Sequence, residues 1–265
     1  MLSGLFNKEN KYEKIKDNKT NYRHHIINIY YRYCDLSFLC IFSAIILGGD
    51  GFNMSDYYSC DYLCSLRDMH RKIPDIYISD GNRTAGKTTA FTRKLVDRFL
   101  KDGGMFYYLY RNKTDLGSCA DTFFGDVGPK FYSGHEMTEK TLLKGNAVLL
   151  LLDDQPCGFC LALSMARKYK KNRGLFTQVV HGFFDEYQDE DGEYLNEEVS
   201  KMMSIHTTIA GGNAEHSRRV PLYMASNTVS VLNPYYHAFG IDKRLRKNTR
   251  ILRGNGWVYE RTFNK

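Results

Sequence analysis

Eight residues in the first third of the chain have the types and spacing needed to bind phosphate. They read Gly81-Asn82-Arg83-Thr84-Ala85-Gly86-Lys87-Thr88, followed by Thr89. In the pattern G-x-x-x-x-G-K-[ST], the glycines let backbone N–H groups close around phosphate oxygens, and the lysine reaches the outer phosphates. The threonine hydroxyl is a ligand for Mg2+. We therefore predict that this phosphate-binding loop (P-loop), with Thr89, binds ATP and Mg2+, and that Thr88 is a metal ligand.

The segments on either side give the loop the context that this motif needs. The apolar run at 76–78 favours a buried strand, and apolar residues recur at helical spacing over 87–101. A helix that begins here adds its unpaired N–H groups and the positive end of its dipole to the phosphate site. A glycine-containing turn before a helix is the alternative, and the order of strand, loop and helix argues against it.

A pair of adjacent carboxylates, Asp185 and Glu186, follows the P-loop by about 100 residues. The apolar residues 178–184 predict a strand that ends in this pair. In ATPases with a P-loop, the first acid holds Mg2+ and the second polarises the attacking water as a general base. The adjacent acids favour a hydrolase over a small-molecule kinase. Two surface residues at the end of a strand are the alternative interpretation.

Five further polar residues are candidates for nucleotide contact. Arg111 ends an aromatic run that predicts a strand, at the edge where ligands bind in open α/β sheets. Ser226 and Asn227 end a later predicted strand, and we expect them to sense the γ-phosphate. Arg218 and Arg219 precede that strand, and we expect one of them to stabilise transition-state charge in a neighbouring subunit. A surface arginine pair is the alternative.

The predicted elements that position these residues alternate between strands and helices. A strand, a helix and a strand over 76–110 make a parallel βαβ unit. Residues 147–152 and 159–163 predict two antiparallel strands joined by a tight loop, and 194–209 predict a helix with an apolar stripe. The expected fold is therefore α/β: a P-loop NTPase of the additional-strand, catalytic-glutamate type. Its sheet is mostly parallel, lies between helices and carries an inserted β-hairpin.

Composition divides the chain into three segments. Of 265 residues, 43% are apolar and 25% are charged, which is ordinary for a globular protein. Residues 1–53 are set apart by an apolar run at 36–47, which is too short to cross a bilayer. We expect 1–53 to be an accessory extension or a mis-assigned start, and 54–240 to be the ATPase domain. Residues 241–265 are expected to be a basic C-terminal segment, either a linker or the start of a missing domain.

Basic residues gather in two places in a chain whose net charge is +7. Residues 166–173 hold five of them, and 242–265 hold eight against two acids, with Trp257 and Tyr259 interleaved. Basic residues mixed with aromatic ones suit contact with nucleic acid. The alternatives are a solvated face for the first run, and for the second a tail whose aromatic rings pack on the domain.

The cysteines favour a reducing compartment. There are seven, an odd number at irregular spacing, which argues against a secreted disulfide framework. Cys157 and Cys160 have metal-ligand spacing, but a structural zinc site needs a second pair, so we favour ordinary buried thiols.

Several segments of the sequence resemble viral DNA-packaging ATPases (terminase large subunits), and most specifically the encapsidation ATPases of small podoviruses. Arg83 lies inside the P-loop, where those proteins place an arginine. Three other segments are similar: Phe106-Tyr107-Tyr108-Leu109-Tyr110-Arg111, Leu163-Ser164 after the hairpin, and Phe184-Asp185-Glu186. The most specific stretch is Ser226-Asn227-Thr228-Val229-Ser230-Val231-Leu232-Asn233-Pro234-Tyr235. The resemblance covers roughly residues 73–246, about two-thirds of the chain.

The resemblance implies a ring-forming motor, a homopentamer at the portal of a viral procapsid, that hydrolyses ATP to drive double-stranded DNA inward. It would act in the cytoplasm of the infected host cell, with a packaging RNA as a further candidate partner. Arg83 would contact the γ-phosphate, and Arg218 or Arg219 would complete a neighbouring site. Too few residues follow the ATPase core for the family's nuclease-like domain, so no DNA cleavage is expected.

Two other functions stay open. A membrane-associated assembly ATPase of the kind that filamentous phages use is supported only by the apolar run at 36–47, and a membrane partner is not expected. A nucleotide-switched scaffold module would bind ATP without turnover, and the intact Glu186 argues against it.

Overall fold

The computed structural model describes residues 58–211 and 218–262. The predicted extension at 1–53, with its apolar run at 36–47, lies outside these residues. Within them, no helix combines the length and the apolar character needed to span a bilayer.

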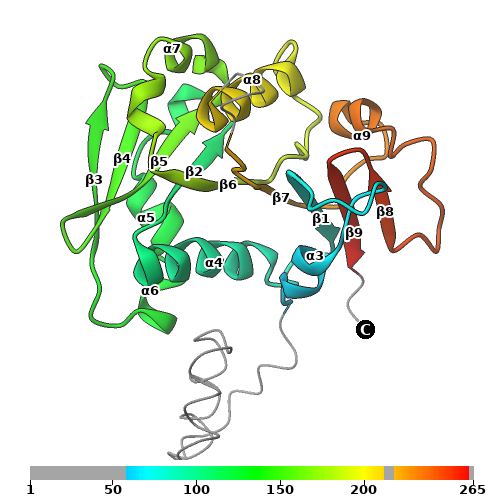
Figure 1. The fold of residues 1–265 in the computed structure, drawn as a ribbon, viewed down its shortest axis with the longest axis horizontal. Helices are drawn as coiled ribbons and strands as arrows, with labels where there is room; N and C mark the ends of the chain where they lie inside the picture. Colours follow the sequence, from blue (N-terminus) through cyan, green and yellow to red (C-terminus); the bar gives the residue numbers. More distant parts are fainter. Residues whose placement is uncertain (1–57, 212–217, 263–265) are drawn as a thin grey trace, which may run out of the picture. The chain divides into compact units, whose positions relative to one another are not determined.

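A single sheet of nine strands runs through the described residues (Figure 1). Its spatial order is β3-β4-β5-β2-β6-β7-β1-β9-β8. The strands are β1 (Ile76–Gly81), β2 (Met105–Tyr110), β3 (Met137–Leu142), β4 (Ala147–Leu152), β5 (Gln155–Ala162), β6 (Val179–Asp185), β7 (Leu222–Asn227), β8 (Ile251–Gly254) and β9 (Trp257–Thr262). From β5 to β9 across this order every pairing is parallel, whereas β3, β4 and β8 pair antiparallel.

Helices cover both faces of the sheet, as predicted. In Figure 1, α4 and α5 lie below the sheet, and α7 and α8 lie above it. The helices are α3 (Asp61–Ser65), α4 (Lys87–Asp102), α5 (Cys119–Phe124), α6 (Gly128–Phe131), α7 (Ala166–Lys170), α8 (Glu198–Ala210) and α9 (Pro234–Phe239). Short 3-10 turns occupy Lys113–Asp115, Leu163–Met165 and Arg173–Phe176.

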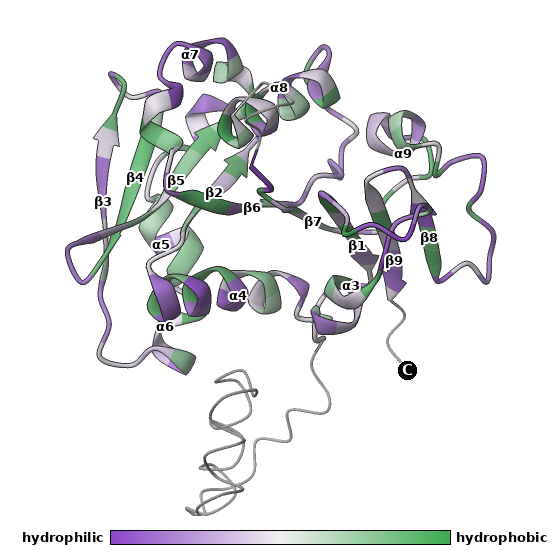
Figure 2. Ribbon diagram, viewed as in Figure 1, coloured by the Kyte–Doolittle hydropathy of each residue, from purple (hydrophilic) through white to green (hydrophobic). Residues whose placement is uncertain are grey.

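The central strands are apolar on both sides because both sides are covered. In β2, Tyr107 and Leu109 join the core under α7 and α8, and Phe106 and Tyr108 join the core under α4 and α5. Figure 2 shows the same pattern, with apolar strands β2, β4 and β5 between helices whose outer sides are polar. Successive side chains of β2 thus enter opposite cores and all of them are apolar, which is why the aromatic run was correctly predicted to be a strand.

The predicted β-hairpin is present, but its turn is tighter than expected. Asp153 and Asp154 adopt φ values of 50° and 62°, so β5 begins at Gln155 rather than near residue 159. A turn with positive φ at both central residues has a twist that matches the twist of the two strands it connects. The edge strand β3 was not predicted, because its residues are mostly exposed and include Glu139 and Lys140. Charged side chains on an edge strand oppose aggregation through it.

Two boundaries differ from the sequence prediction. Helix α8 begins at Glu198 rather than at residue 194, because Glu197 has a positive φ of 55° and the Glu198 carboxylate accepts a hydrogen bond from the Leu195 N–H. The segment after residue 240 contributes β8 and β9 to the sheet, and β9 pairs with β1. Trp257 and Tyr259 are buried, so their rings pack on the domain, as the second interpretation of that segment expected.

We expect Gly182→Ala to destabilise the fold by about 1–3 kcal/mol, the usual cost of overpacking a core. Gly182 lies in β6 opposite Tyr107, and a Cβ there would come within 2.1 Å of that ring. The control is Gly174→Ala, whose Cβ meets no atom within 4 Å. Chemical denaturation of both variants measures the difference; equal stabilities would contradict the packing argument.

Candidate active site

The P-loop lies at the edge where the carboxyl ends of β5, β2, β6, β7 and β1 meet, between β1 and α4. Gly86 precedes α4 with a φ of 84°, and Thr84 also has a positive φ of 66°. Asn82, Arg83 and Thr84 are exposed on the turn, Ala85 is buried, and Thr89 lies in the first turn of α4. The loop therefore has the conformation in which backbone N–H groups can surround an anion.

Lys87 is folded back over this loop. Its side chain is largely buried, and its Nζ donates a hydrogen bond to the Asn82 carbonyl at 2.9 Å. Burial lowers the pKa of Lys87, although the negative charges of Asp80 and Asp185 act in the opposite direction. A cation held among these groups is positioned for the phosphates that the motif predicts.

Asp185, at the end of β6, lies beside Thr88 at the start of α4, close enough for the Thr88 side chain to lower the pKa of the Asp185 carboxyl. Burial raises the pKa of Asp185 to about 7, the Thr88 hydrogen bond lowers it, and the charge of Glu186 raises it. A hydroxyl and a carboxylate are the oxygen ligands that Mg2+ prefers. The two residues that the sequence assigned to the metal are thus brought together from distant parts of the chain, and they fit the ion.

Glu186 is exposed next to Asp185 and has a φ of 51°. This left-handed backbone costs a non-glycine residue about 1–3 kcal/mol and persists only where the surroundings hold it. Its N–H donates to the Asp185 carboxylate at 3.0 Å. The carboxylate of the predicted general base is therefore free to face solvent beside the predicted metal ligands.

Strand β7 brings Ser226 and Asn227 to the start of the P-loop. The two residues lie opposite Asp80 and Gly81 in the parallel pairing with β1. The Ser226 hydroxyl accepts a hydrogen bond from the Gln188 N–H at 3.3 Å. The pairing places both residues beside Gly81, and their role in sensing the γ-phosphate stays a prediction.

Arg83, the arginine inside the P-loop, forms an ion pair with Glu190. Its Nη2 lies 2.6 Å from the Glu190 Oε1, which also accepts a 3.5 Å hydrogen bond from the Asn227 side chain. Both members of the ion pair are more than half exposed, so the pair contributes little stability and can be exchanged for another anion. Glu190 carries no motif in the sequence, and its contact with Arg83 was not predicted.

Arg111 differs from its predicted role. Its Nε lies 3.0 Å from Glu198, its Nη1 lies 3.2 Å from Asp189, and its Nη2 donates to the carbonyls of Glu186 and Tyr187 at 3.4 and 3.0 Å. Every nitrogen of the guanidinium thus faces an acceptor of the protein. The structure assigns Arg111 to holding the segment after Glu186, whereas we had expected it to bind a ligand.

Arg218 and Arg219 lie at the opposite edge of the sheet, before the amino end of β7. Arg218 donates to the carbonyls of Phe176, Val179 and Ile209. Arg219 donates to the Pro74 carbonyl at 2.7 Å and to the Tyr77 hydroxyl at 3.0 Å. Neither side chain reaches the P-loop of its own chain, and contact with a neighbouring subunit stays a prediction.

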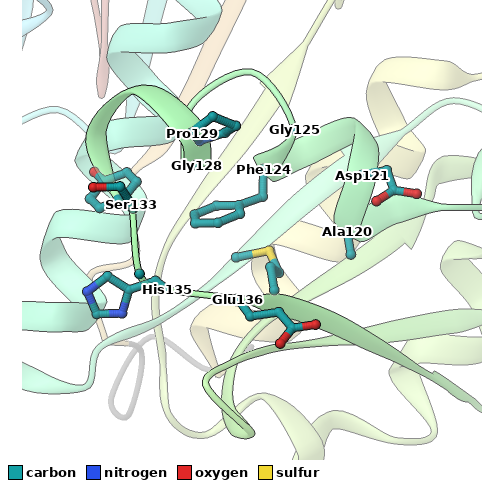
Figure 3. A pocket seen from close by; sticks show the side chains of 12 residues that line it. Ala120, Asp121, Phe124, Gly125, Gly128, Pro129, Ser133, His135 and Glu136 are labelled. Atoms are coloured by element: carbon teal, nitrogen blue, oxygen red, sulfur yellow. The ribbon is translucent and has the colours of Figure 1, made fainter.

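Other candidate sites lie away from this edge. Cys157 and Cys160 are buried, and the described residues hold no cluster of three metal-ligating side chains. A cavity of about 320 Å3 is lined by α5, α6 and the residues before β3, including Phe124, Pro129 and His135 (Figure 3). No predicted site residue lines it, and His135 pairs with Asp153 at 2.6 Å.

Comparison with known proteins gives concordant matches. The family described as podovirus DNA encapsidation protein (Gp16) matches residues 53–253. The DNA packaging protein of Bacillus phage phi29 is 28% identical over 173 residues, covering 64% of this chain and 48% of that protein. The corresponding protein of Bacillus phage B103 is 29% identical over 178 residues, covering 65% and 51%. The chain thus spans about half the length of these curated relatives.

The fold is shared with a solved domain. The crystal structure of the N-terminal domain of the DNA packaging ATPase from bacteriophage phi29 matches with a TM-score of 0.62 and 26% sequence identity. The match covers 78% of this chain and 96% of that domain. The predicted P-loop NTPase fold is confirmed.

Proposed function

The chain belongs to the podovirus DNA encapsidation protein family, and on that premise we propose that it is an ATP-hydrolysing motor that moves double-stranded DNA into a procapsid. One observation carries the proposal: the side chains of Thr88 and Asp185 lie beside each other near the buried Lys87, with Glu186 next to them. The relatives from phi29 and B103 are DNA packaging proteins, which supports the assignment of DNA as the substrate that is moved.

Each residue of the site has a separate role in ATP hydrolysis. Lys87 and the N–H groups of the P-loop bind the β- and γ-phosphates, and Thr88 and Asp185 would hold Mg2+. When bound there, Mg2+ would supply positive charge to offset the charge on the phosphate oxygens. Glu186 accepts a proton from the water that attacks the γ-phosphorus, and the bond between that phosphorus and the ADP oxygen breaks. Arg83 exchanges Glu190 for the γ-phosphate.

The partners follow from the same family. We propose a ring of identical subunits at the viral portal in the infected host cell, as the phi29 protein occurs in a packaging motor assembly. Five subunits and a packaging RNA remain predictions drawn from the resemblance.

The surface formed by α7 and α8 suits contact with the DNA backbone. Arg167, Lys168, Lys170, Lys171 and Arg173 are all exposed there, and the buried ring of Tyr169 anchors the helix. A cavity of about 470 Å3 between these elements is lined by Lys170, Arg173 and the hydroxyl side chains Ser204, Thr207 and Thr208. Cations and hydroxyls are the groups that most often contact phosphates.

We expect the double variant Lys170→Ala/Arg173→Ala to weaken DNA binding uniformly across sequences. Each lost phosphate contact reduces the slope of log affinity against log salt by about 1, so the slope should fall by about 2. Fluorescence anisotropy with a DNA duplex at several salt concentrations measures it, alongside DNA-stimulated ATP hydrolysis. The control is Lys130→Ala/Lys140→Ala, which removes the same charge from α6 and β3. Equal losses in both variants would count against the α7 surface.

ATP hydrolysis with and without DNA also tests the proposed function as a whole. Turnover that rises with DNA and falls with salt is expected from a motor. ATP binding without any turnover, in the presence of portal and procapsid, would favour the scaffold module instead.

A further inference from the structure

A buried carboxylate that the hydrolysis step does not use lies directly beside the P-loop. Asp80 precedes Gly81 in β1 and is completely buried. It accepts hydrogen bonds from the Tyr187 hydroxyl at 2.7 Å, from the Gln188 Nε2 at 2.9 Å and from the Tyr236 hydroxyl. Burial raises the pKa of Asp80 to about 7, and these hydroxyl groups lower it. A carboxyl group in such a place is costly unless it is fully hydrogen-bonded.

Asp80 determines which way the amide of Gln188 points. Because the carboxylate offers only acceptors, the Nε2 of Gln188 must face it. The Oε1 of Gln188 then faces the other way and accepts from the N–H groups of Val229 and Ser230 at 3.3 and 3.4 Å. A single side chain therefore joins the strand before the P-loop to the segment after β7.

The bonded residues lie next to the catalytic ones in sequence. Tyr187 and Gln188 directly follow Glu186, whose φ of 51° requires support from its surroundings. The segment after β7 also presents three exposed apolar side chains, Val229 at 39%, Val231 at 54% and Leu232 at 87%. Asp80 thus holds Tyr187 and Gln188, the two residues after Glu186. Through Gln188 it also holds the backbone of Val229 and Ser230, which leads to Val231.

We propose that Asp80 and Gln188 are positioning residues. They fix the position of Glu186 relative to the P-loop, and they couple that position to the conformation of residues 228–232. This inference rests on the proposed ATPase function. Nucleotide binding depends on the P-loop itself, whereas turnover depends on where Glu186 stands. Disturbing the pair should therefore lower kcat far more than it lowers nucleotide affinity.

A reciprocal exchange of the two side chains tests the pair. In Asp80→Asn, one carboxylate oxygen becomes an NH2 group, so either the Gln188 Nε2 or the Tyr187 hydroxyl faces a donor in place of an acceptor. In Gln188→Glu, two buried carboxylates face each other. The double variant Asp80→Asn/Gln188→Glu restores one donor and one acceptor, and its glutamate still accepts from Val229 and Ser230. The Tyr236 hydroxyl can donate instead to the Tyr259 hydroxyl, which lies 3.1 Å away.

We expect each single variant of the full chain to lose about 10- to 100-fold in kcat, the effect of misplacing a reacting group by about 1 Å. The affinity for a fluorescent ATP analogue should change far less than kcat, and mainly in Asp80→Asn, which removes a negative charge near Lys87. The double variant should recover most of the lost kcat. A kcat for Asp80→Asn equal to that of wild type would overturn the proposal, and so would a double variant no better than the single ones.

Asp68→Asn separates positioning from mere stability. Asp68 is also a buried carboxylate, 3% exposed, and it accepts from the N–H groups of His70, Lys72 and Gly256 at 2.8, 2.8 and 3.0 Å. Its replacement should lower the unfolding temperature without changing kcat. If Asp80→Asn did only the same, its role would be structural. A wild-type protein without turnover would instead refute the proposed function, independently of these variants.

Discussion

Glu186→Gln should bind ATP with nearly the wild-type affinity and hydrolyse it roughly 10^2- to 10^4-fold more slowly, the contribution typical of a general base. Glutamine has the shape of glutamate but cannot accept the proton from the attacking water. Phosphate binding relies on Lys87 and the P-loop, which the substitution does not touch. Single-turnover hydrolysis and binding of a fluorescent ATP analogue measure the two effects separately.

The matched control for this experiment is Glu193→Gln. Glu193 is an exposed acid in the same loop, seven residues further on, so its replacement makes the same change of charge near the site. It should leave turnover unchanged. Comparable turnover in the two variants would refute the assignment of Glu186 as the base.

Arg111→Ala should lower the free energy of unfolding by about 3–5 kcal/mol, the cost of leaving a buried charge without its partner. The side chain of Glu198 is 0% exposed and that of Arg111 is 13% exposed. The Tyr235 hydroxyl and the Leu195 N–H also donate to Glu198, at 2.7 and 2.8 Å, so the loss should lie near the lower end of that range. Denaturant unfolding measures it.

A double variant distinguishes the two effects of this arginine. Arg111→Met/Glu198→Met removes both charges and should destabilise the fold less than Arg111→Ala, although the Tyr235 hydroxyl and the Leu195 N–H lose their acceptor. Turnover should nevertheless stay low, because the carbonyls of Glu186 and Tyr187 have lost the guanidinium that holds them. Full turnover in a stable double variant would show that Arg111 serves the fold alone.

The control for stability is Arg98→Ala. Arg98 and Asp102 form an i,i+4 pair on α4 at 2.9 Å, with side chains 50% and 40% exposed. Exposed pairs of this kind contribute about 0–1 kcal/mol. A loss at Arg98 as large as that at Arg111 would mean that burial is not the reason for the expected effect.

Local chemistry made the P-loop, Asp185 and Glu186 readable from the sequence. A phosphate-binding turn needs glycine, lysine and threonine at fixed spacing. The two acids directly follow an apolar run that predicts a strand, and both patterns are local in the sequence. The order of strand, loop and helix then predicted the sheet edge where Thr88 and Asp185 meet. The aromatic run before Arg111 was also recognisable as a strand, because its pattern is set by neighbouring residues.

Long side chains were harder to assign. Arg111, Arg218 and Arg219 each flank a strand. Their side chains are long enough to reach several hydrogen-bond acceptors, and the sequence does not indicate which acceptor each one binds. Arg111 lies at the predicted edge but is bound by Glu198, which is 87 residues away. Arg218 and Arg219 lie at the other edge, bound mainly by main-chain carbonyls. An arginine pairs with whatever the fold brings near, so its role depends on distant segments.

The sequence by itself predicted a phosphate-binding loop, a metal-binding acid and a general base, because each of these is a short pattern of residue types. Only the tertiary structure decided what holds them in place. Asp80 lies in an apolar strand without any motif, and its partners Tyr187, Gln188 and Tyr236 come from positions 107 to 156 residues further on. β9 joins β1 from the end of the described chain. Such contacts arise when remote strands align in one sheet, and no local pattern records that alignment.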